Sequence, residues 1–184
     1  MRKTDLQNNL AMTIVLLSGA MLFATLFMGY AIYRTSASQW PPLGIPKVSL
    51  LVPFLSTVII VLSSWFAYQL RVCAQQGNML KAHSNLNTTL LLGLCFMLAQ
   101  SYLWFHMKST GVFVGTSGIF GSILYGFTWI HAFHMVAGMT TLVYLKLVLK
   151  KGGPNVVQKS INVEKFWHFL GVVWIIMFLT LFVL

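Results

Sequence analysis

The chain has 184 residues, of which 58% are hydrophobic and only 8% are charged, and its mean hydropathy is +0.80. A soluble domain carries about 25% charged residues, so this composition excludes a water-soluble fold and predicts that lipid surrounds most of the surface. The formal net charge of +10 does not indicate nucleic-acid binding, because the basic residues lie in short segments between apolar runs rather than on one polar face.

Five apolar stretches are long enough to cross the hydrocarbon core, which takes about 20 residues in a helix. In chain order they are residues 10–33, 49–70, 87–107, 118–149 and 166–184. The first exceeds the apolar core of a cleavable signal peptide, which has about 7–15 residues, so we expect it to be retained. Prolines and glycines predict a loop over residues 36–46, and the segment 150–154 (KKGGP) ends the fourth span. The predicted fold is an all-α membrane protein, with residues 1–184 forming one bundle of five transmembrane helices.

The basic residues between the spans predict the orientation of the bundle. With the N-terminus inside, nine of the twelve Lys and Arg residues lie on the inner side and three, Arg34, Lys47 and Lys108, lie on the outer side. Cytoplasmic loops carry the excess of Lys and Arg in membrane proteins. The sequence therefore predicts an inner N-terminus and an outer C-terminus.

Small or polar residues recur at helical spacing within every span. Helices in lipid associate through close packing of such residues and a few hydrogen bonds, so these stripes predict the packing faces. In chain order they are Ser18, Thr25 and Gly29; Ser49, Pro53, Ser56, Ser63 and Ala67; Thr89, Gly93 and Gln100; Thr128, His131, His134, Gly138 and Thr141; and His168 and Gly171. Indole side chains favour membrane interfaces, where we expect Trp40, Trp104 and Trp167. Cys73 and Cys95 have no metal-binding or disulfide spacing, and we expect both to be buried.

Groups that support chemistry are scarce within the spans. The only acids, Asp5 and Glu164, lie outside the centres of the spans, whereas proton-driven transporters place acids at depth. Heme would need a second imidazole facing His131, and His168 is predicted to lie about 10–15 Å away in depth. A metal at His131 and His134 alone would lack ligands. We therefore expect two neutral imidazoles that hydrogen-bond across helices and fix the bundle or its contact with a partner.

Glu164 lies four residues before His168. This spacing places the two side chains on one helix face, where they form an ion pair or hydrogen bond, unless Glu164 is a solvated carboxylate at the membrane interface. The spacing alone leaves both possibilities open.

Two histidine-containing segments resemble a known family. Residues 125–138 (YGFTWIHAFHMVAG) resemble the paired-histidine helix of cytochrome c oxidase subunit III, and residues 166–174 (FWHFLGVVW) resemble the signature of its last helix. Residues 17–24, 53–57 with 63–64, and 92–96 leading to Gln100 agree with the remaining spans. The chain is similar to the five-helix form of subunit III, which occurs in many bacterial cytochrome c and quinol oxidases.

The resemblance implies a non-catalytic subunit of a respiratory heme–copper oxidase. Such a subunit stabilises catalytic subunit I and binds phospholipid, and it carries no heme or copper because both lie in the partner. It implies a location in an energy-transducing membrane, most simply the bacterial plasma membrane. No residue is then catalytic, cofactor-binding or metal-binding. The structural and partner-contact candidates are His131, His134, Gly138, His168, Trp167, Gln100 and Glu164.

Three family acids are replaced in this sequence, by Gly19, Leu103 and Gly171. Their loss argues against the acid-dependent role in proton uptake that the family suggests. It also leaves open a subunit-III-like component of a nitric oxide reductase or of another respiratory complex. A stand-alone membrane cytochrome or channel-like protein is a further alternative of a different class.

Overall fold

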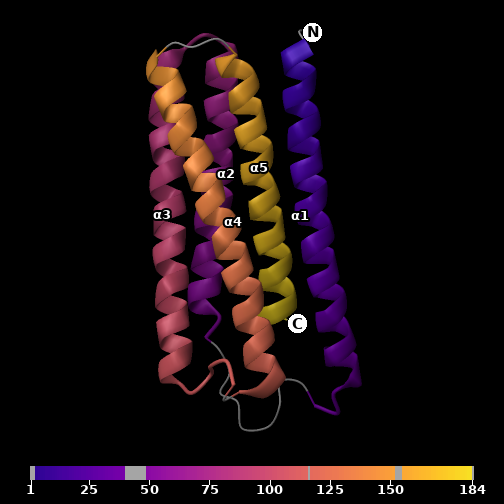
Figure 1. The fold of residues 1–184 in the computed structure, drawn as a ribbon. Coiled ribbons are helices and arrows are strands. Elements are labelled where there is room, and N and C mark those ends of the chain that lie inside the picture. The colour runs from indigo at the N-terminus through magenta and orange to yellow at the C-terminus, as the bar shows by residue number, and fades with distance from the viewer. Residues whose placement is uncertain (1–2, 40–48, 116, 152–154, 184) are drawn as a thin grey trace.

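A computed structural model describes residues 3–39, 49–115, 117–151 and 155–183. Five long helices run alternately up and down, so that the two ends of the chain lie at opposite ends of the bundle (Figure 1). They are α1 (Lys3–Ser36), α2 (Leu51–Gln75), α3 (Met79–Ser109), α4 (Gly118–Lys151) and α5 (Val156–Phe178). The described residues contain no strand. All five helices are long and apolar enough to span a membrane, which confirms the predicted all-α class.

The helices extend beyond most of the predicted apolar spans. Helix α5 begins at Val156, whereas the predicted apolar run begins at Phe166. The difference arises because the first turns of α5 are helical but polar, and hydropathy does not detect them. After Phe178 the chain continues as a π-helical segment, Leu179–Val183. The predicted loop positions from Trp40 to Pro46, the outer-side Lys47, the turn at residues 152–154 and the terminal Leu184 lie outside the described residues.

Helices α2, α3, α4 and α5 form the core of the bundle. Helix α2 packs along α3 and also contacts α5, and α4 packs against both α5 and α3. Their predicted stripes are largely confirmed, since Pro53, Ser56, Ser63 and Ala67 of α2 and Thr89, Gly93 and Gln100 of α3 are buried. Ser49 is an exception, because it is exposed.

Helix α1 stands at the edge of this core, chiefly against α5 (Figure 1). Its predicted stripe is wrong, because Ser18 and Thr25 are exposed while Gly19, Phe23 and Tyr30 are buried. Thr25 uses its hydroxyl within its own helix, where it donates to Met21 O at 2.8 Å. A hydroxyl that is satisfied locally does not require a neighbouring helix, so aromatic packing decides which face of α1 turns inward.

Polar contacts hold α1 to α5 at both ends. Near the start of both helices, Gln158 Nε2 donates to Asn9 Oδ1 at 2.6 Å. Near their other end, Tyr30 Oη donates to the Thr180 carbonyl at 2.6 Å, within the π-helical segment. The first of these contacts places the polar first turns of α5 against the start of α1.

Candidate functional site

The centre of the bundle is organised around Trp167, which is fully buried. Its ring lies between Gly93 of α3 and Gly138 of α4. A methyl group added at Gly93 would lie 2.9 Å from the ring, and one added at Gly138 would lie 3.2 Å from it. The indole Nε1 donates to Ser63 Oγ of α2 at 3.1 Å. We call these four residues the Trp167 junction; it joins all four core helices, and Trp167 is enclosed by protein rather than exposed to the lipid interface.

The hydroxyl of Ser63 continues this connection, because it donates to the Thr89 carbonyl of α3 at 3.2 Å. Two other tryptophans make bonds of the same kind. Trp174 Nε1 of α5 donates to Thr57 Oγ1 of α2, and Trp104 Nε1 of α3 donates to Thr128 Oγ1 of α4, each at 3.1 Å. An indole N–H has no partner in lipid, so each of these bonds selects one helix pairing and register.

His131 lies in an aromatic enclosure and is 1% exposed. Its ring centroid lies 5.7 Å from that of Trp174, 6.0 Å from Phe96 and 6.2 Å from Phe23. Among the described residues neither ring nitrogen has a hydrogen-bond partner. The structure therefore differs from the expected hydrogen bond across helices, and His131 contacts its neighbours through ring packing.

His134 is half-buried and points toward α1, with its ring 5.4 Å from that of Phe23. Its Nδ1 lies 2.8 Å from the Ile130 carbonyl of its own helix, so this nitrogen too is engaged within α4 rather than across helices. Phe23, which the sequence did not single out, thus contacts both histidines. The shared helical face that the sequence predicted for His131 and His134 is the face that meets α1.

Gln100 is 2% exposed inside the bundle. Its carboxamide nitrogen and oxygen both lack a hydrogen-bond partner in the described part of the chain. The sequence identified Gln100 as part of a packing stripe, and its burial agrees with that position.

An ionic cluster joins the last turns of α2 to the first turns of α5. Arg71 Nε lies 2.5 Å from Glu164 Oε2, and His168 Nε2 lies 3.5 Å from Glu164 Oε1. Glu164 is buried while His168 is half-buried, so the carboxylate is enclosed rather than solvated. The Arg71 guanidinium also lies 5.0 Å from the centroid of the Tyr68 ring. Sequence reasoning missed Arg71, although a lone acid in an apolar helix requires a cation nearby.

The positions of the three replaced family acids offer little room for a larger side chain or lie in apolar surroundings. A methyl group at Gly19 would lie 3.0 Å from the Phe169 ring, and one at Gly171 would lie 3.1 Å from Ser64 Oγ. Leu103 is fully buried among apolar residues. Neighbouring side chains thus occupy the space that an acid would need at positions 19 and 171, and the surroundings of position 103 are apolar.

The described residues contain no group of three or more His, Cys, Asp or Glu residues arranged to hold a metal ion. Cys73 is buried, as expected, whereas Cys95 is exposed on α3. The prediction for Cys95 was therefore wrong, because the lipid-facing side of a helix accepts a small apolar thiol as readily as the core does.

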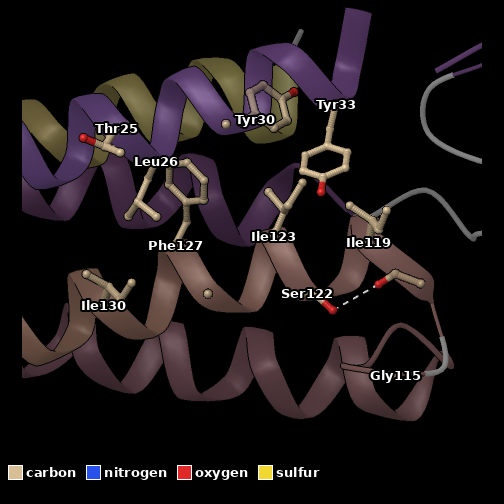
Figure 2. A pocket seen from close by; sticks show the side chains of 13 residues that line it. Thr25, Leu26, Tyr30, Tyr33, Gly115, Ile119, Ser122, Ile123, Phe127 and Ile130 are labelled. Carbon is tan, nitrogen blue, oxygen red and sulfur yellow. Dashed lines mark hydrogen bonds between the residues drawn. The ribbon is translucent and has the colours of Figure 1, made fainter. Parts of the chain in front are cut away.

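A groove of about 590 Å³ opens between the second half of α1 and the first half of α4 (Figure 2). Its walls are apolar side chains such as Leu26, Ile123 and Phe127, and Gly29 and Gly126 widen it. Tyr33 and Ser122 provide polar groups toward the end of the groove where α4 begins. Ser122 is occupied within α4, since it donates to Gly118 O at 3.1 Å.

Known proteins share this sequence over nearly its whole length. The chain is 34% identical over 178 residues to cytochrome c oxidase subunit 3 of Corynebacterium diphtheriae, covering 92% of this chain and 85% of that protein. It is 31% identical over 175 residues to the probable cytochrome c oxidase subunit 3 of Mycobacterium leprae, with 92% and 85% covered. It is 27% identical over 176 residues to cytochrome c oxidase subunit 3 of Synechocystis sp., with 93% and 73% covered.

A family profile described as cytochrome c oxidase subunit III matches residues 4–184. This match includes the two histidine-containing segments and all five helices, apart from Lys3 at the start of α1. Together with five helices long enough to span a membrane, it shows that the chain is a membrane-embedded component of an oxidase complex and belongs to the cytochrome c oxidase subunit III family.

Proposed function

We propose that this chain is a non-catalytic subunit of a respiratory heme–copper oxidase that stabilises catalytic subunit I and binds lipid. The observation that carries the proposal is the Trp167 junction. There the Trp167 indole and the Ser63 hydroxyl use their hydrogen bonds to join α5, α2 and α3 to one another. Bonds of this kind give a rigid bundle. A rigid apolar bundle supports the shape of a neighbouring subunit without carrying electrons itself.

The site residues then divide by position. Trp167, Gly138 and His131 are enclosed by this chain's own helices, so we assign them to holding the bundle in shape. His168 is half-buried at the surface of α5, beside the Arg71–Glu164 pair, and we assign it to contact with subunit I. Both roles support assembly rather than the reduction of oxygen.

The decisive experiment is to purify the chain with its natural partners and also alone. We expect it to co-purify in a fixed ratio with a heme–copper subunit and to show no heme absorbance when isolated. A stoichiometric heme spectrum from the isolated chain would overturn the proposal in favour of a membrane cytochrome. The gas that the purified assembly reduces, oxygen or nitric oxide, assigns the partner.

For lipid binding, we propose that an acyl chain occupies the groove between α1 and α4 (Figure 2). The apolar walls of the groove suit an acyl chain, and the polar groups of Tyr33 and Ser122 at one end suit the headgroup that the chain carries. Native mass spectrometry of the complex should show retained phospholipid that is lost in Ile123→Trp, which fills the groove. Leu147→Trp, at an exposed position of the same helix away from the groove, is the control. Equal lipid retention in both variants would place the lipid elsewhere.

We also propose that the chain lies in a bacterial plasma membrane with its N-terminus in the cytoplasm. The two termini lie at opposite ends of the bundle (Figure 1), and most Lys and Arg residues of the sequence belong to the end that carries the N-terminus. A reporter that is active only outside the cytoplasm should work when it is fused to the C-terminus. Activity of the same reporter at the N-terminus instead would reverse the topology.

A further inference from the structure

Two polar side chains in the bundle differ from the other buried polar groups. Gln100 of α3 and His131 of α4 are 2% and 1% exposed. Among the described residues none of their four polar side-chain atoms has a hydrogen-bond partner. Ser63 and Thr128, also buried, both have partners. A buried polar group without a partner is destabilising, so a pair of them requires an explanation.

The register of the α3–α4 interface places Gln100 near the level of His131. On one side of Gln100, Trp104 Nε1 donates to Thr128 Oγ1 at 3.1 Å. On the other side, the ring centroids of Phe96 and His131 lie 6.0 Å apart. Gln100 is four residues, or about 6 Å of helix, from both Phe96 and Trp104. It is therefore buried on α3 between the two residues that contact Thr128 and His131 of α4.

We propose that Gln100 and His131 together bind an internal water molecule between α3 and α4. A carboxamide offers both donors and an acceptor, and a neutral imidazole offers one of each. Buried water typically makes about three hydrogen bonds to such groups. The rings of Phe23, Phe96 and Trp174 enclose His131, so a ligand of its ring nitrogens has to be as small as water.

The chemistry of the two groups favours water over an ion. Both are uncharged donors and acceptors, and the described part of the chain brings no acid or cysteine set together to hold a metal. The water cross-links two helices by hydrogen bonds, in the same way that Trp104 and Thr128 do directly one turn away. This role is structural and is separate from the proposed contact with subunit I.

A high-resolution map of the unaltered protein in its complex tests the inference directly. We expect density for an ordered water within hydrogen-bond distance of both the Gln100 carboxamide and the His131 ring. A direct bond between the two side chains, or a dry interface without density, would overturn it. Because this map needs no variant, it stays decisive even where a substituted chain does not fold.

Thermal unfolding of the complex gives a second test through Gln100→Leu, His131→Leu and the double variant. If one water serves both side chains, removing either partner leaves the other without its bond, whereas the double variant removes both polar groups. The double variant should therefore lower the Tm by less than the sum of the single variants, and by no more than the larger of them. Ser101→Ala is the matched control, because Ser101 Oγ donates to Met97 O in its own helix at 3.0 Å. It should shift the Tm independently of His131→Leu. Additive shifts for Gln100 and His131 would show two separate sites and contradict a shared water.

Discussion

The α carbon of Gly138 lies against the indole of Trp167, so closely that a methyl group there would approach ring carbon Cζ3 to 3.2 Å and Leu170 Cδ1 to 2.8 Å. These two contacts let α4 and α5 approach without an intervening side chain. Close approach of this kind is the main source of helix association in lipid. The absence of a side chain at position 138 thus determines how tightly the bundle packs.

Gly138→Ala should therefore destabilise the bundle, by about 1–3 kcal/mol as is typical of overpacking. The measurement is thermal unfolding of the purified complex, followed by loss of its size-exclusion peak. Gly126→Ala is the control, since a methyl group at Gly126 of the same helix meets nothing within 4 Å. Equal effects of the two substitutions would show that helix propensity, not contact with Trp167, governs the result.

The bond from Trp167 Nε1 to Ser63 Oγ predicts coupling between two helices. Trp167→Phe and Ser63→Ala should each lower stability, and a double-mutant cycle should give a coupling energy of about 0.6 kcal/mol, the average for such bonds in membranes. Ser64→Ala, one position along α2, is the control and should show no coupling to Trp167. A cycle that closes without coupling for Ser63 would mean that this hydrogen bond contributes nothing to stability.

The Arg71–Glu164 pair predicts an asymmetry between single and double variants. Glu164→Gln leaves a cation beside an uncharged amide, and Arg71→Gln leaves a buried carboxylate whose remaining ion-pair partner among the described residues is His168. Each single variant should lose more stability than the double variant, because breaking an enclosed pair costs more than replacing it. Lys165→Gln, at an exposed position next to Glu164, should change little. Yield of the assembled complex and its Tm measure the effect, and a double variant worse than both singles would contradict it.

The bond from Tyr30 Oη to the Thr180 carbonyl predicts that α1 slows amide hydrogen exchange in the π-helical segment. In Tyr30→Phe we expect faster amide hydrogen exchange over the segment Leu179–Val183, corresponding to a loss of about 1 kcal/mol. Tyr33→Phe is the control, since Tyr33 is 50% exposed. Unchanged exchange in Tyr30→Phe would show that packing alone holds the π-helical segment.

Much of the architecture follows from the order of residues along the chain. Five apolar runs of sufficient length must become helices in a membrane, because a backbone in lipid has to satisfy its own hydrogen bonds. The stripe from Pro53 to Ala67 correctly predicted the inner face of α2. The paired histidines and the Phe-Trp-His-Phe segment were specific enough to identify the family, which the matching proteins confirmed.

Only the tertiary structure decided how each helix is rotated and which side chains meet. The sequence placed Ser18 and Thr25 of α1 inward, yet Phe23 and Tyr30 are buried instead, since a hydroxyl bonded within its own helix leaves the choice to aromatic packing. It placed Trp167 at a lipid interface, yet the indole lies at the centre beside two glycines. Hydropathy measures how favourably a whole helix enters lipid and does not distinguish one face of the helix from another. The rotation of a helix about its axis depends instead on contacts with residues far away in the sequence.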